Sequence, residues 1–130
     1  MNLESPKVTL KKNQAEMYQF LIQVENYKQL MPESMEKFEV TAANAFLFVL
    51  KGMPQIELKI QETKEPGLVV LGSTSEKFNF SLKVIIEPAS EDSSEVQLLF
   101  DGKFNAMMSM MVKGPLKKFI TTLSENIARV

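Results

Sequence analysis

The feature that most constrains this chain is a change in its hydrophobic period at Lys37. From there, six consecutive segments alternate apolar and polar residues, separated by turn-like residues. A period of two is typical of strands that bury one face and expose the other. These segments predict an antiparallel meander covered on one side. They are "KFEVTA", "AFLFVLK", "QIELKIQET", "LVVLGST", "FNFSLKVIIEP" and "EVQLLFDGKF".

Helical periodicity precedes the meander. The stretch "NQAEMYQFLIQVEN" predicts a helix, with Asn13 as its N-cap and Glu16 completing a capping box. A second short helix, "ENYKQLM", is expected to end before Pro32, because a residue ahead of proline avoids the helical region. Before both helices, "LESPKVTL" predicts a first strand, with Pro6 near an edge where a missing N–H is tolerated.

A helix that covers the sheet is predicted at the end of the chain. Asn105 is a candidate cap for a helix that begins ahead of the methionines. Pro115 then has two interpretations: it kinks one long helix, or Gly114 ends a short helix and Pro115 opens another. The sequence does not choose between them. The apolar stripe of this helix consists of Leu116, Phe119, Ile120, Leu123 and Ile127.

Composition excludes several functional classes. The chain has no cysteine and no histidine, which argues against thiol chemistry, hydrolase triads and zinc sites, so we expect no cofactor and no metal. A net charge of −1 gives no field for collecting nucleic acid. We find neither a membrane-spanning segment nor a signal peptide, and we expect a cytoplasmic protein with one domain over residues 1–130.

The order of elements and three motifs resemble the START-like (SRPBCC) superfamily, which includes the polyketide cyclase/dehydrase proteins. The motifs are "ESPKVTL", "VENYKQLMP" and "MMVKGPLKKFITTL". The resemblance implies an α+β helix-grip fold, in which a curved antiparallel sheet of about seven strands (β-α-α-β6-α) wraps around a long C-terminal helix. It also implies a hydrophobic cavity between sheet and helix. The short chain implies a small or collapsed cavity.

Candidate ligand-binding residues follow from this resemblance and from the apolar pattern. Tyr27 is expected at the cavity entrance. The methionines of "NAMMSMM" have three interpretations: they fill an awkward gap in an ordinary core, form an adaptable ligand wall, or make a partner-binding patch. Met110 is expected to face away from the others. The predicted cavity lining is Phe48, Leu58, Phe80, Leu82, Leu98, Phe100, Met107, Met108, Met111, Val112 and Phe119.

The leading hypothesis is binding of a small apolar molecule, lipid-, quinone- or polyketide-like, without catalysis. One alternative is a cyclase/dehydrase-like enzyme, which needs a proton-transfer group in the cavity. Another is a protein-interaction module with a collapsed cavity, recognisable by an outer apolar patch. The residues that fall off the inward pattern are candidates for such a patch or for a homodimer surface: Leu47, Val49, Ile85 and Leu99.

Overall fold

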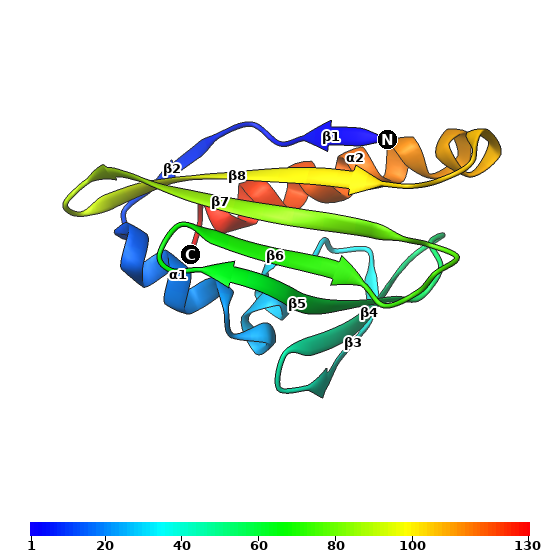
Figure 1. The fold of residues 1–130 in the computed structure, drawn as a ribbon, viewed down its shortest axis with the longest axis horizontal. Helices are drawn as coiled ribbons and strands as arrows, with labels where there is room; N and C mark the ends of the chain where they lie inside the picture. Colours follow the sequence, from blue (N-terminus) through cyan, green and yellow to red (C-terminus); the bar gives the residue numbers. More distant parts are fainter.

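A computed structural model describes all residues from Met1 to Val130. It contains one curved antiparallel sheet in the order β1-β8-β7-β6-β5-β4-β3, with β2 also paired to β8 (Figure 1). The predicted meander is confirmed, with strand ends that differ by a few residues. The strands are β1 (Asn2–Glu4), β2 (Val8–Leu10), β3 (Met35–Ala42), β4 (Ala45–Leu50), β5 (Ile56–Lys64), β6 (Leu68–Ser73), β7 (Phe80–Ser90) and β8 (Ser93–Gly102).

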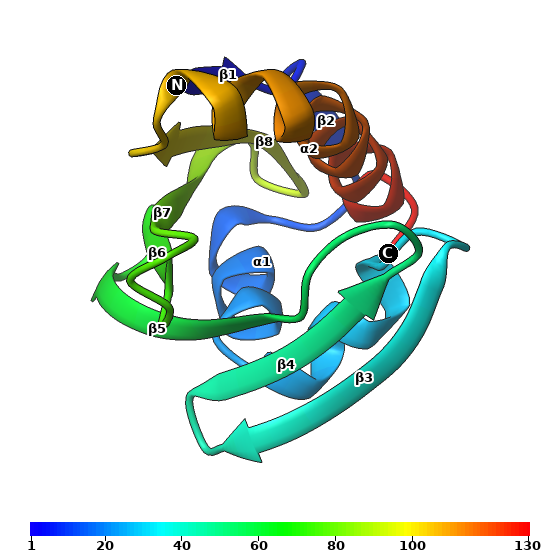
Figure 2. The same ribbon diagram turned by 90° about the vertical axis from the view of Figure 1, so that its right-hand side faces the viewer.

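Three helical elements lie on the concave side of the sheet. They are α1 (Gln14–Leu21), the 3-10 helix η1 (Val24–Leu30) and the long α2 (Ala106–Ile127). Figure 2 shows the sheet curving around these helices, with α2 opposite the strands β3 and β4. This is the predicted α+β helix-grip architecture. The core lies between the concave face and the helices, and it contains residues from every element except β1 and β3.

The two ends of α1 are both closed by side chains. The predicted capping box is present: Asn13 Oδ1 accepts from the Glu16 N–H at 2.9 Å, and Glu16 Oε1 accepts from the Asn13 N–H at 3.2 Å. At the other end, Asn26 Nδ2 donates to the Phe20 carbonyl and the Tyr27 hydroxyl donates to the Leu21 carbonyl. Because the last carbonyls of a helix lack backbone donors, these contacts explain why η1 folds tightly against α1.

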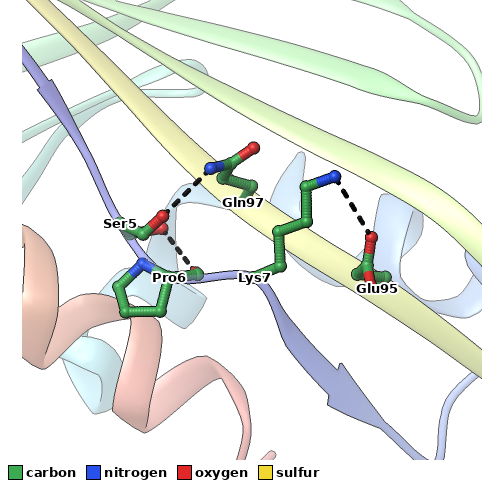
Figure 3. Close-up of polar contacts among 5 residues, drawn as sticks. All are labelled: Ser5, Pro6, Lys7, Glu95 and Gln97. Atoms are coloured by element: carbon green, nitrogen blue, oxygen red, sulfur yellow. Dashed lines mark hydrogen bonds and ion pairs between the residues drawn. The ribbon is translucent and has the colours of Figure 1, made fainter.

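The first predicted strand is divided into β1 and β2 by a short break at Ser5–Lys7 (Figure 3). Proline cannot donate to the ladder, so pairing with β8 is interrupted beside Pro6. Ser5 restores it: the Leu98 N–H donates to the buried Ser5 Oγ at 2.9 Å, and Gln97 Nε2 donates to the Ser5 carbonyl at 3.0 Å. Polar contacts therefore replace the missing ladder bond at this edge.

The structure resolves the ambiguity at Pro115, because α2 runs through it as one continuous helix. Asn105 caps the start, with its Oδ1 accepting from the Met108 N–H at 2.8 Å. The half that follows Pro115 is tied to both flanks: Ser124 Oγ donates to the Pro6 carbonyl, and Asn126 Nδ2 donates to the Leu30 carbonyl. The half that precedes it buries only Val112. The helix is therefore firmly held on one side of Pro115 only.

Candidate ligand-binding groove

The structure brings together most of the predicted cavity-lining residues at the seam between sheet and helix. Eight of them lie in the buried core, and Met108 packs partly buried against it. Their alternation in the sequence reflects their position on the concave face. The eight buried residues are Phe48, Leu58, Phe80, Leu82, Leu98, Phe100, Val112 and Phe119.

Aromatic rings pack in two groups along this seam. Phe48 of β4 stacks on Phe119 of α2 with ring centroids 5.4 Å apart, which joins the sheet directly to the helix. Phe80 and Phe100 stack at 4.9 Å on the neighbouring strands β7 and β8. Such offset pairs add to the stabilisation that burial provides. Phe119 also borders the groove described below.

The structure does not bring Met107 and Met111 to the seam. Their side chains are 73% and 69% exposed, and Met110 is 84% exposed. The reason is the position of each residue around the helix axis. Met108, Val112 and Leu116 follow one another at intervals of four and share the side that faces the core, so the methionines beside Met108 and Val112 point outward. Of the three interpretations, core filling fits Met108 alone. The exposed methionines occupy the position expected of a surface patch.

Tyr27 lies in the core, not at an opening. Its side chain is 3% exposed, and its ring stacks on Phe46 at 4.9 Å. The hydroxyl donates to the Leu21 carbonyl at 2.7 Å, so it is fully engaged in closing α1. Burial raises the pKa of Tyr27 above its usual value of 10.0 because the phenolate would lose its hydration. The expected entrance role is therefore not supported by its position.

A groove of about 360 Å³ lies where the middle of α2 faces the end of β4. Its apolar surface comes from Leu50, Met53, Pro115 and the edge of Phe119, the last of which is one of the predicted residues. The β4–β5 turn supplies one wall, and the segment after η1 supplies Pro32 and Ser34. At roughly 30 Å³ per liquid water molecule, this volume equals about twelve waters. It suits a small ligand, near the lower end of ordinary ligand sites.

Gly114 leaves this groove open on the helix side. A Cβ built on Gly114 meets no heavy atom within 4 Å, so a larger side chain would project into free space. Glycine costs a helix about 0.5–1 kcal/mol relative to alanine. Its presence in mid-helix beside Pro115 thus weakens α2 at the point where the helix borders the groove.

The rim of the groove is cationic. Lys51 and Lys118 are its only charged lining residues, and the Ser34 side chain adds a hydroxyl. Neither lysine lies within ion-pair distance of a carboxylate. Pockets that combine an apolar wall with a few polar groups orient a ligand by those groups. This arrangement would favour a ligand with one apolar end and one polar or anionic end.

The core itself offers few groups for proton transfer. The buried ionisable residues are Tyr18 and Tyr27, and the buried polar residues are Ser5, Ser94 and Ser124. Two polar residues beside the core, Asn79 just before β7 and Asp101 of β8, are exposed to solvent. The pKa of the solvent-facing Glu57 is lowered by hydrogen bonds from Thr41 and Thr74. None of these groups lines the groove.

The four candidate residues for an outer apolar patch lie in two separate parts of the sheet. Leu47 and Val49 lie on β4, whereas Ile85 and Leu99 lie on β7 and β8. Strands β5 and β6 separate the two pairs, and all four residues are half-buried. They do not form one continuous surface. A homodimer through them stays a prediction.

Sequence reasoning missed most of the groove. Only Phe119 was predicted as a lining residue, while Leu50 and Lys51 end the predicted strand "AFLFVLK" and Met53 belongs to the turn-like residues that follow it. Their meeting with Gly114 and Pro115 depends on the path that α2 takes across the sheet, which no local pattern encodes. Gly114 and Pro115 themselves were the available signal, because a break in a covering helix is unusual.

Comparisons with known proteins agree with this architecture. No family model matches the chain, and no curated protein matches it by sequence. XoxI from Bacillus cereus has a solved structure similar to 98% of this chain and 93% of its own, with a TM-score of 0.76 and 5% identity. A START superfamily protein from Mycobacterium smegmatis matches over 98% and 97%, with a TM-score of 0.71 and 12% identity.

Norcoclaurine synthase from Thalictrum flavum, in complex with dopamine and hydroxybenzaldehyde, is a third similar structure. It matches 99% of this chain and 84% of its own, with a TM-score of 0.73 and 10% identity. No helix of the present structure is both long enough and apolar enough to cross a bilayer. A cytoplasmic location stays a prediction. The shared topology shows that this chain has the helix-grip fold of the START-like proteins.

Proposed function

We propose that this protein binds a small hydrophobic molecule, without chemical conversion, in the groove between β4 and α2. The observation that carries the proposal is the groove itself: a mainly apolar recess bordered by Phe119, whose ring stacks on the buried Phe48. A ligand there would lose water from its apolar surface. Each buried methylene would contribute about 0.8 kcal/mol.

The ligand that fits best has an apolar body and one polar end. Lys51, Lys118 and the Ser34 hydroxyl stand at the rim, where they would meet a carboxylate, phenol or carbonyl group. A lipid-, quinone- or polyketide-like fragment has this chemistry. Norcoclaurine synthase, which shares the fold, accommodates dopamine and hydroxybenzaldehyde. Those compounds are small and aromatic, and the groove is also small.

Deeper entry would require α2 to move. Its first half is attached mainly through Val112 and Met108, whereas its second half is tied through Ser124 and Asn126. Displacement about Gly114 would admit a ligand toward the predicted cavity residues, such as Phe80 and Phe100. Hinges of this kind absorb backbone change at a few positions. The cavity-lining role of these residues belongs to the proposal.

The enzymatic alternative has less support. A cyclase/dehydrase-like reaction needs a proton-transfer group beside the substrate, and the only ionisable groups that line the groove are Lys51 and Lys118. No third group orients either amine, because neither makes an ion pair. Binding alone accounts for the geometry.

A pair of substitutions at one position tests the proposal. Gly114→Leu would add a branched side chain at the helix border of the groove, whereas Gly114→Ala would add only a methyl group, and both should stabilise α2. The fluorescent probe 1-anilinonaphthalene-8-sulfonate is apolar with one anionic end. We expect the wild type and Gly114→Ala to bind it equally and Gly114→Leu to bind it at least about tenfold more weakly.

Equal binding by all three proteins would refute the groove as the site. Cooperative unfolding of each variant in urea checks that the probe is not reporting a loosened core. Native mass spectrometry of the protein purified from cells gives an independent test. A co-purifying apolar compound that is lost in Gly114→Leu would support the proposal.

A further inference from the structure

The beginning of α2 combines exposed methionines with unpaired lysines. Met107, Met110 and Met111 are the most exposed large apolar side chains of the chain, at 69–84%. Such side chains are costly to hold in water unless something covers them. They lie in the first two turns of α2, at one end of the long axis of the molecule (Figure 1).

The charge around these methionines is one-sided. All 16 acidic residues of the chain lie outside residues 102–124, whereas four of its 15 basic residues lie inside. No carboxylate lies within ion-pair distance of any of the four. This local excess of positive charge contrasts with the net charge of −1 for the whole chain. The four residues are Lys103, Lys113, Lys117 and Lys118.

The apolar and basic residues are arranged in sequence along the helix. Met107 and Met111 lie four residues apart on one side of the helix, and Lys118 follows seven residues later on the same side. Lys117 follows Met110 by seven residues on a neighbouring stripe. At 1.5 Å per residue, Lys117 and Lys118 follow Met111 by about 10 Å along the axis. With the axis of α2 steeply inclined to the membrane plane, this offset along the axis becomes a difference in depth. Methionines in the acyl region would then place Lys117 and Lys118 at the phosphate level.

We propose that the first half of α2 docks on an anionic lipid bilayer, with Met107, Met110 and Met111 inserted and the lysines contacting lipid phosphates or carboxylates. Charge complementarity argues for an anionic surface. The order of exposed methionines followed by Lys117 and Lys118 along α2 matches the depth profile of a bilayer, which a flat acidic protein surface lacks. Flexible methionine side chains also suit a fluid phase. The inference does not depend on the groove binding a ligand.

Vesicle sedimentation tests the proposal. Vesicles of phosphatidylcholine with roughly one-third phosphatidylserine should bind the protein, and pure phosphatidylcholine vesicles should bind it far less. Lysine near an anionic surface contributes about fivefold in affinity. The variant Lys113→Gln/Lys117→Gln/Lys118→Gln should therefore bind on the order of a hundredfold more weakly. The variant Met107→Gln/Met110→Gln/Met111→Gln should lose about tenfold or more, because its apolar surface is gone.

Control variants change exposed residues on other parts of the surface. Lys59→Gln/Lys83→Gln changes two exposed lysines on the outer face of the sheet and should reduce binding much less than the α2 lysine variant. The chain has no tryptophan, so Met110→Trp provides a unique fluorophore at the proposed insertion site. Its emission should shift to the blue with anionic vesicles, whereas that of Val40→Trp on the distant β3 should not.

Each outcome decides the question. Equal binding to neutral and anionic vesicles, or equal shifts for Met110→Trp and Val40→Trp, would overturn the proposal. Absence of vesicle binding by the wild type would also overturn the proposal, and it would favour an acidic protein as the partner for this surface. Because all the substituted side chains are exposed, urea unfolding should show folded, cooperative variants.

Discussion

Replacing Tyr27 with phenylalanine removes one oxygen atom and keeps the ring in its stack on Phe46. The hydroxyl donates to the Leu21 carbonyl at 2.7 Å, in place of the backbone donor that the last turn of α1 lacks. A net hydrogen bond contributes about 0.5–1.5 kcal/mol, and a buried acceptor left unpaired costs about 1–3 kcal/mol. Tyr27→Phe should therefore lower the free energy of unfolding by about 1–3 kcal/mol.

Urea unfolding followed by circular dichroism measures this change as a lower midpoint at an unchanged slope. Tyr18→Phe is the matched control, because Tyr18 is also buried but its hydroxyl makes no hydrogen bond to another residue. We expect a change of less than about 0.5 kcal/mol for the control. If the two variants unfolded at the same urea concentration, the assigned role of the Tyr27 hydroxyl would be wrong.

The same hydroxyl makes the stability depend on alkaline pH. Burial raises the pKa of Tyr27 above 10.0, so above pH 10 the unfolded phenol ionises while the folded one stays protonated. The folded state then binds more protons, and stability falls by up to about 1.4 kcal/mol per pH unit. Tyr27→Phe lacks this contribution. Its deficit relative to the wild type should shrink above pH 10, and a constant deficit would contradict the sign of the shift.

Three further substitutions test local features by urea unfolding. Asn105→Ala removes the N-cap of α2 and should cost about 1 kcal/mol; no loss would show that the methionine turns are already frayed. Ser5→Ala leaves the buried Leu98 N–H without its side-chain acceptor and should cost about 1–3 kcal/mol, with faster hydrogen exchange at Leu98. Gly102→Ala places a Cβ 2.6 Å from the ring of Phe104 and should cost about 1–3 kcal/mol, whereas Gly114→Ala should gain about 0.5–1 kcal/mol; changes of the same sign would contradict this contrast.

The sheet was predictable because its pattern is strong and local. Alternation along β7, from Phe80 to Ile86, places every second side chain on the concave face, and a shift of one residue would expose all of them. The capping box at Asn13 and the N-cap at Asn105 were equally readable, since each needs only nearby residues. The apolar stripe of α2 likewise predicted which side of the helix meets the sheet.

The candidate site was less predictable because it depends on tertiary geometry. A proline within a helical pattern permits either a kink or a break, and burial of Val112 and Leu116 on both sides of Pro115 decides for continuity. Methionine is apolar and so suggests burial, yet the position of Met111 around the helix axis turns its side chain outward. Extending the stripe of Leu116 backward by steps of four would have revealed this. Nothing local predicts that Tyr27 closes α1.

Strand β3 forms one free border of the sheet, and its construction limits how copies of this chain can associate. Its ladder to β4 is interrupted by register shifts near Met35 and Val40, and Lys37 and Glu39 form an ion pair on it at 3.7 Å. Irregular, charged borders are poor templates for adding another strand. Self-association through a continuous intermolecular sheet is therefore disfavoured at β3, and the protein is protected there against fibrous aggregation.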